Sequence, residues 1–110
     1  MDCIFCQIIQ RKISADIIYE DDSIIVISDI FPKAPQHKLI IPKKHIPTLN
    51  ELSFEDRDLI AQMMFKARDL AHELNIDKSG YRVIINCNKD AGQIVYHLHL
   101  HLMGGKKLSM

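Results

Sequence analysis

The chain has 110 residues, of which 47% are hydrophobic and 25% charged, and its 14 basic residues balance its 14 acidic ones. This size and composition are typical of one soluble domain with a modest core, and the neutral balance argues against a nucleic-acid partner. No apolar run approaches the ~20 residues that a membrane helix needs, and the N-terminus lacks a signal-peptide pattern. The 3 cysteines, an odd number, favour free or metal-bound thiols over disulfides. We therefore expect one cytoplasmic domain over residues 1–110 that does not associate with membranes.

The chain begins with a predicted short helix. Apolar residues recur at helical spacing over positions 2–12, and Asp2 is placed to cap that helix. Cys3 and Cys6 lie three residues apart on it, so both thiols are expected to face one direction.

A hairpin and a third strand are predicted next. Segments 17–20 and 23–28 are rich in β-branched residues and flank the pair Asp21-Asp22, which indicates two strands joined by a turn. A loop with two prolines leads to a third strand at 37–41. Residues 43–52 show no clean hydrophobic period, so we expect a connection or a short helical turn there.

A long central helix is the most regular prediction. Ser53 is its N-cap candidate, with acidic residues in the first turn. An apolar stripe then runs for about five turns, formed by Leu59, Ile60, Met63, Met64, Ala67, Leu70, Ala71 and Leu74. The methionines are expected to fill the core, and His72, near the helix end, to be solvated and without chemistry.

Two more strands, 82–86 and 96–103, are predicted on either side of a polar loop at 88–93, whose Gly92 would let a ligand approach the backbone closely. Strands, a long helix and further strands indicate an α+β fold with a five-stranded antiparallel sheet. Strands such as 24–27 are apolar on both faces, and two helices hardly cover both sides of such a sheet. We therefore expect the sheet to meet a second copy of the chain.

The most informative stretch is His-Leu-His-Leu-His-Leu-Met at 97–103. Side chains alternate faces along a strand, so His97, His99 and His101 would share one face, about 6.6 Å apart, while the leucines enter the core. Histidine is a nucleophile, a general acid or base and a metal ligand near neutral pH. Such a row predicts a catalytic or metal site.

This stretch resembles the His-φ-His-φ-His-φ-φ signature of the histidine triad (HIT) superfamily, in which φ is apolar. Several blocks resemble its Hint branch in the same order, and the likeness runs from about Ile4 to Gly104. These blocks are Asp29-Ile30-Phe31-Pro32, Pro35-Gln36-His37, Ile41-Pro42-Lys43-Lys44-His45 and Gly92-Gln93-Ile94-Val95-Tyr96. The resemblance implies the HIT-type fold and a homodimer joined across the sheet.

The resemblance also implies a hydrolase that cleaves purine nucleoside 5′-phosphoramidates at the α-phosphate. His99 matches the nucleophile, which would form a covalent nucleotidyl-histidine intermediate. His101 matches the residue that stabilises charge on the phosphate oxygens. His37 matches a fourth family histidine that orients the triad or relays a proton, and an ordinary hydrogen-bonded histidine is an equal alternative.

Nucleotide contacts are implied outside the triad. Asp29 matches the carboxylate that binds the ribose hydroxyls, with a strand-end cap as the alternative. The matching purine walls, which the residue types alone would assign to the core, are Phe5, Ile8, Ile13 and Ile30. The matching phosphate contacts are Asn86 and the backbone of Gly92 and Gln93.

The chain departs from the Hint pattern at two points. Ile94 stands where a serine is usual, which removes a hydroxyl near the leaving group. The tail after Gly105 is short and has no tryptophan. Both departures concern leaving-group preference and leave the nucleophile unchanged.

A second cluster is implied by Cys3, Cys6, His45 and His97, which match a structural zinc set of bacterial-type family members. Two thiolates and two imidazoles suit tetrahedral zinc. The alternative is a pair of packed thiols; a redox pair is disfavoured because no βαβ pattern surrounds them. If zinc binds, His97 is structural and only His99 and His101 face the substrate.

Two other functions remain open from the sequence. One is a dinucleoside polyphosphate hydrolase or nucleotidyl transferase of another HIT branch. The other is a zinc-stabilised nucleotide-binding or adaptor protein without turnover, which would not need a nucleophile. The sequence does not distinguish adenine from guanine.

Overall fold

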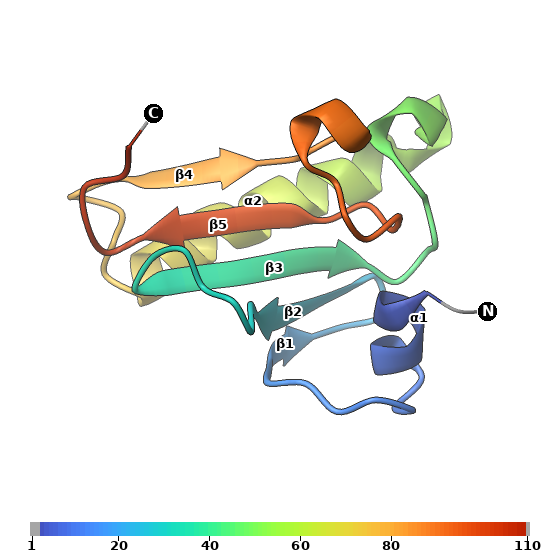
Figure 1. Cartoon of the computed structure of the whole chain (residues 1–110), viewed down its shortest axis with the longest axis horizontal. Coiled ribbons are helices and arrows are strands. Elements are labelled where there is room, and N and C mark those ends of the chain that lie inside the picture. The colour runs from blue at the N-terminus through green and yellow to red at the C-terminus, as the bar shows by residue number, and fades with distance from the viewer. Residues whose placement is uncertain (1–2, 110) are drawn as a thin grey trace.

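The computed structural model describes residues 3–109 and has an α+β fold, as the sequence predicts (Figure 1). Five antiparallel strands form one sheet in the order β1-β2-β3-β5-β4. They are β1 (Ile17–Glu20), β2 (Ile24–Ser28), β3 (Gln36–Pro42), β4 (Tyr81–Ile84) and β5 (Leu100–Gly104), with α1 (Ile4–Ile9) and α2 (Arg57–Glu73) as the helices. Within residues 3–109 no helix is both long and apolar enough to cross a membrane.

Helix α2 covers one face of the sheet and builds the larger core (Figure 1). Leu98, Leu100 and Leu102 are all 0% exposed, which confirms that the leucines of the triad stretch enter the core. Of the two methionines in the predicted stripe, Met63 is buried, but Met64 is 47% exposed. The prediction was wrong for Met64, because it lies about 100° around the helix from the buried Met63 and falls outside the face that packs on the sheet.

Helix α1 packs against the other face, over β2 and β3. Phe5 and Ile8 lie there in a second cluster with Ile25 and Ile27. The apolar residues on both faces of β2 are therefore covered within the chain itself, by α2 and by α1. This removes the reason for expecting a second copy over that strand.

The start of β5 differs from the prediction of a strand over 96–103. The strand begins only at Leu100, so His97 and His99 lie in the segment that leads into it. The neighbouring strand β3 ends at Pro42, which has no N–H to continue the ladder. Its carbonyl is instead bonded to the ring of His97, and Leu98 N–H donates to the carbonyl of Ile46 at 2.7 Å.

Other boundaries also shifted. The predicted cap Asp2 lies outside the described residues; Cys3 is the N-cap of α1, and its Sγ accepts from the N–H of Cys6 at 3.4 Å. The predicted helix to residue 12 stops at Ile9, and Arg11 has a φ of 64°, outside the helical region.

The remaining elements follow the prediction closely. The turn at Asp21 is confirmed, since its Oδ1 accepts from Ser23 N–H at 2.7 Å. Ser53 N–H donates to Asp56 Oδ2 at 3.0 Å, so the predicted cap begins a 3₁₀ turn that leads into α2. The stretch 43–52 contains a short 3₁₀ turn, Leu49–Glu51.

Candidate active site and metal centre

The three predicted catalytic histidines gather on the α1 side of the sheet. His101, on β5, lies opposite Leu39 of β3, and His37 lies two residues before Leu39 on the same strand. Residues two apart on a strand face the same side, so both rings meet, with His37 Nε2 and His101 Nδ1 3.0 Å apart. The rings of His99 and His101 have centroids 5.0 Å apart.

The hydrogen bond of His99 fixes its tautomer. Its Nδ1 lies 2.7 Å from the carbonyl oxygen of His97, which can only accept, so Nδ1 carries the proton. Burial lowers the pKa of His99, so the ring is neutral at pH 7. The opposite nitrogen, Nε2, therefore carries a lone pair and no proton, which is the form that can attack phosphorus.

The tautomers of His37 and His101 follow from one backbone group. Lys33 N–H donates to His37 Nδ1 at 3.0 Å, so the proton of the neutral His37 ring is on Nε2. That N–H donates to His101 Nδ1, which places the proton of His101 on its own Nε2. Burial, with His99 and His37 alongside, lowers the pKa of His101 to about 4, and burial also lowers that of His37. The hydrogen bonds therefore run in one direction, from the Lys33 N–H to the neutral His37 ring and from that ring to the neutral His101 ring.

Asp29 begins the loop after β2 and uses its two oxygens differently. Oδ1 accepts from the N–H of Phe31 at 2.8 Å, which is the local cap considered from the sequence. Oδ2 lies 3.3 Å from His37 Nε2, beside the histidine pair. The carboxylate is thus fixed next to the predicted catalytic residues while it also caps the loop.

The predicted base-contacting residues have different surroundings. Phe5 and Ile8 are buried in the α1 cluster, and the Phe5 ring lies edge-on to His99 with centroids 5.1 Å apart. Ile30 is 79% exposed and Ile13 37% exposed. Two apolar residues therefore pack within the fold, and the other two are open to solvent.

The predicted phosphate loop is held together by its own bonds. The N–H groups of Gly92 and Gln93 donate to Lys89 and Asn88 carbonyls, at 2.9 and 3.1 Å. Gly92 has a φ of 87°, a conformation that favours glycine. The amide of Gln93 is buried and bonded to the loop and to Pro47, so it is engaged within the protein, while Asn86 is half-buried.

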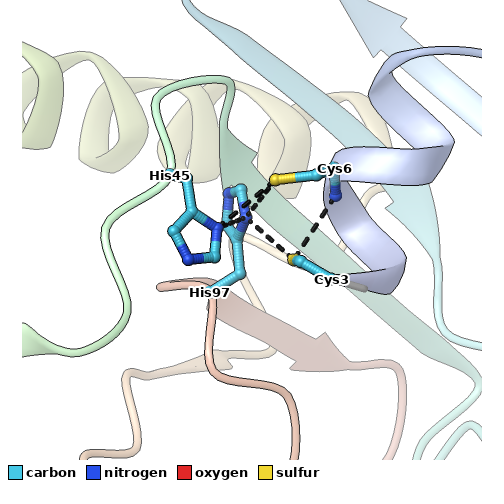
Figure 2. Close-up of side chains that lie close together, drawn as sticks. All are labelled: Cys3, Cys6, His45 and His97. Carbon is cyan, nitrogen blue, oxygen red and sulfur yellow. Dashed lines mark hydrogen bonds between the residues drawn. The ribbon is translucent and has the colours of Figure 1, made fainter. Parts of the chain in front are cut away.

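The four predicted metal ligands come together from three segments that are distant in sequence (Figure 2). Cys6 Sγ lies 3.3 Å from His45 Nδ1 and 3.6 Å from His97 Nδ1, Cys3 Sγ lies 3.4 Å from His97 Nδ1, and the two Nδ1 atoms are 3.1 Å apart. A tetrahedral zinc with Zn–S of ~2.3 Å and Zn–N of ~2.0–2.1 Å separates sulfur from nitrogen by roughly 3.5 Å and nitrogen from nitrogen by roughly 3.3–3.4 Å. The donor set fits such an ion.

The outer nitrogen of His97 strengthens this fit. Its Nε2 lies 2.7 Å from the carbonyl of Pro42, so Nε2 carries the proton and Nδ1 offers its lone pair to the cluster. Histidines that bind metals typically donate their other N–H in this way.

Asp29, His37 and His101 also bring three donor atoms close together, but they fit a proton better than a metal. A metal on His37 Nε2 would require the ring proton on Nδ1, where it would face the N–H of Lys33. The two clusters thus differ in chemistry, although His97 and His101 lie only four residues apart.

Two supporting groups were missed by sequence reasoning. The N–H of Lys33 and the carbonyl of Pro42 set the tautomers of His37 and His97, but backbone groups carry no residue-type signal. Prolines flank the third predicted strand close to both groups, but a proline in the sequence does not indicate that a neighbouring backbone group sets a histidine tautomer.

Comparison with known proteins defines the class. A family model described as scavenger mRNA decapping enzyme C-term binding matches residues 2–110, and the chain belongs to this histidine triad (HIT) family, which confirms the resemblance seen in its motifs. The purine nucleoside phosphoramidase of Escherichia coli K12 is 45% identical over 107 residues, covering 97% of this chain and 90% of that protein. An uncharacterized HIT-like protein of Buchnera aphidicola is 47% identical, covering 96% and 92%.

Solved structures agree with this class. A HIT family hydrolase from Legionella pneumophila superimposes with a TM-score of 0.96 at 44% identity, covering 98% of this chain and 96% of that one. A histidine triad protein from Clostridium difficile gives a TM-score of 0.95 at 41% identity, covering 100% and 96%.

Proposed function

We propose that the chain is a purine nucleotide-binding hydrolase that cleaves nucleoside 5′-phosphoramidates at the α-phosphate, with His99 as the nucleophile. The observation that carries this proposal is the tautomer of His99, whose Nδ1–H is held by the His97 carbonyl so that Nε2 is free to attack. The E. coli relative named purine nucleoside phosphoramidase supports the choice of substrate class.

The proposed reaction has two displacement steps. His99 Nε2 forms a bond to the α-phosphorus as the P–N bond breaks, and the leaving nitrogen takes a proton from solvent water and departs as the amine. Water then attacks the nucleotidyl-His99 intermediate and releases the nucleoside monophosphate. His101 donates its Nε2–H to phosphate oxygens as negative charge develops on them, and His37 orients His101 and relays protons through their shared hydrogen bond.

Nucleotide binding is proposed around this centre. Asp29 accepts hydrogen bonds from the ribose hydroxyls through Oδ2, since Oδ1 already caps the loop. The base lies against the exposed Ile13 and Ile30, with the buried Phe5 and Ile8 packed behind them. The phosphates lie beside Asn86 and the backbone of Gly92 and Gln93, whose N–H groups stay bonded within their loop. Ile94 is 88% exposed and offers no hydroxyl, which favours leaving groups that need no polar contact at that position.

Cys3, Cys6, His45 and His97 are proposed to hold a structural zinc ion. Burial raises the pKa of the Cys6 thiol, so a cation beside it is needed to stabilise the thiolate. The ion would act as a structural cross-link, which leaves His99 and His101 to the substrate. Free or metal-bound thiols also accord with a cytoplasmic protein.

A homodimer is part of the proposal. Both edge strands, β1 and β4, pair on one side only, and β4 adjoins the strand of the catalytic histidines. Such an edge can extend a sheet into that of a second copy. Light scattering coupled to size exclusion tests this, and a monomer at working concentration would remove the dimer from the proposal.

The function is tested by mixing the protein with an adenosine phosphoramidate, quenching, and weighing the intact protein. An adenylyl adduct that is absent from His99→Ala, while that variant still binds AMP, is the expected result. A faster reaction with a dinucleoside polyphosphate would favour the other hydrolase branch. Absence of any adduct and of turnover, with AMP binding intact, would favour a non-catalytic binding protein.

A further inference from the structure

Phe5 connects the two histidine clusters. It lies between the cluster residues Cys3 and Cys6 on α1, and its side chain is buried. Its ring is edge-on to His97, with centroids 5.8 Å apart, and to His99, with centroids 5.1 Å apart. A ring in this position limits how far His99 can rotate towards α1.

His97 makes a second connection through its own backbone. Its ring nitrogen Nδ1 belongs to the metal cluster, while its carbonyl accepts the Nδ1–H of His99 at 2.7 Å. A shift of the His97 ring is thus transmitted to the one hydrogen bond that fixes the tautomer of His99. The Phe5 ring contacts His99 from α1, and the His97 carbonyl contacts it from the segment before β5.

Helix α1 depends on its surroundings. It has 6 residues, too few for a stable isolated helix. Its N-cap is Cys3, so the sulfur that caps the helix is also a cluster donor. Phe5, Ile8 and Ile9 pack at the second core cluster, and beyond these contacts the position of the helix depends on how Cys3 and Cys6 are held.

We propose that Phe5 and His97 are positioning residues that make the orientation of His99 depend on the ligation of the cysteine–histidine cluster. With the cluster ligated, the Phe5 ring and the His97 carbonyl hold His99 in one rotamer and one tautomer. With the cluster open, α1 shifts and the His99 ring samples others. This inference rests on the proposed metal centre. It means that the bound metal would not only cross-link the fold but would also orient His99.

The first test compares full-length protein loaded with zinc, stripped by a strong chelator, and reloaded. The imidazole nitrogen resonances of His99, assigned with His99→Ala, report its tautomer without any substrate. We expect one tautomer in loaded protein, averaged resonances after stripping, and recovery on reloading. The rate of adduct formation should fall on the order of tenfold when the metal is removed, which is the usual effect of losing a group that orients a functional side chain without touching the substrate. A single unchanged His99 tautomer in folded, verified metal-free protein would overturn the proposal.

A second test needs no metal removal and remains decisive if stripped protein unfolds. Phe5→Leu keeps an apolar side chain but removes the ring, with Phe65→Leu as the matched control on the outer side of α2, where Phe65 is 57% exposed. Zinc-loaded Phe5→Leu should retain zinc and yet show altered His99 resonances, whereas Phe65→Leu should match the wild type. Unaltered resonances in Phe5→Leu would contradict the Phe5 connection.

These readouts separate the inference from the proposed function. If no protein forms an adduct, the hydrolase proposal fails, and the nitrogen resonances still decide whether the cluster orients His99. If adducts form at equal rates in loaded and stripped protein and the resonances agree, the hydrolase stands and the coupling is refuted.

Discussion

The side-chain oxygen of Gln93 accepts the N–H of Asn88 at 2.8 Å, while its amide nitrogen donates to the carbonyls of Pro47 and Val95 at 2.9 and 3.1 Å. One buried amide thus joins the loop before the triad to the segment that carries His45. This arrangement fixes the distance between two parts of the site.

Gln93→Leu should destabilise the protein by about 1–3 kcal/mol, because it leaves a donor and two acceptors without partners. Denaturant unfolding measures the change. Gln62→Leu, an exposed position on α2, is the control and should stay within about 0.5 kcal/mol of the wild type. Equal stability of the two variants would contradict a structural role for the Gln93 amide.

Asp29→Asn tests the proposed ribose contact while preserving an oxygen that can cap Phe31 N–H. Since an amide accepts at one oxygen only and carries no charge, KM for ribonucleotide substrates should rise several-fold and discrimination against 2′-deoxyribose should weaken. Steady-state kinetics with matched ribo- and deoxyribo-substrates measure both. Asp22→Asn in the exposed hairpin turn is the control. Discrimination that is unchanged in Asp29→Asn would leave Asp29 as a cap alone.

Acid should destabilise the fold through His101. Its pKa is about 4 in the folded protein and 6.5 by default, so between these values the unfolded chain binds a proton that the folded chain excludes. The free energy of unfolding should therefore fall as pH drops from 6.5 to 4, and His101 should account for about 1–3 kcal/mol of that fall. Above pH 6.5, His101 should make no contribution to the pH dependence of stability.

The comparison variant is His101→Gln, whose side-chain oxygen can still accept from His37. It should lose less stability than the wild type over that pH range, which isolates His101 from acid effects on the metal cluster. His72→Gln changes a histidine whose side chain is 81% exposed and lies 3.0 Å from Asp77; because exposed ion pairs contribute little to stability, it should stay close to the wild type. Identical pH profiles for all three proteins would refute the contribution of His101.

Removal of zinc should lower the melting temperature. We expect about one zinc per subunit, and because zinc binds the native state only, its removal should cost at least about 5 °C. Cys3→Ser should weaken both zinc binding and the fold, while Cys87→Ser, outside the cluster, should change neither. A chelator-insensitive melt together with zinc-free purified protein would leave Cys3 and Cys6 as packed thiols.

The sequence was sufficient to predict the sheet, the long helix and the identity of both clusters. Alternation alone placed Leu98, Leu100 and Leu102 in the core, because side-chain type and periodicity are contained directly in the sequence. The four donors from residues 3 to 97, which lie together in the structure, were named by the resemblance to bacterial-type HIT proteins and not by spacing.

Other features depend on partners that the sequence does not reveal. The late start of β5 follows from the bond between His97 and Pro42, and the tautomer of His37 follows from the N–H of Lys33. The role of Gln93 is equally hidden, because its partners are carbonyl groups from separate segments. Tertiary contacts of this kind decide boundaries and proton positions after local preference has chosen the elements.

The spread of the four cluster residues along the chain has a consequence for biosynthesis. Cys3 and Cys6 leave the ribosome before His45, and His97 follows 52 residues after His45. A nascent chain that has not yet reached His97 exposes two thiols without their full set of histidine partners and also lacks His99. The proposed nucleophile and the last of the proposed ligands emerge two residues apart, so the proposed catalysis and metal capture would become possible almost together.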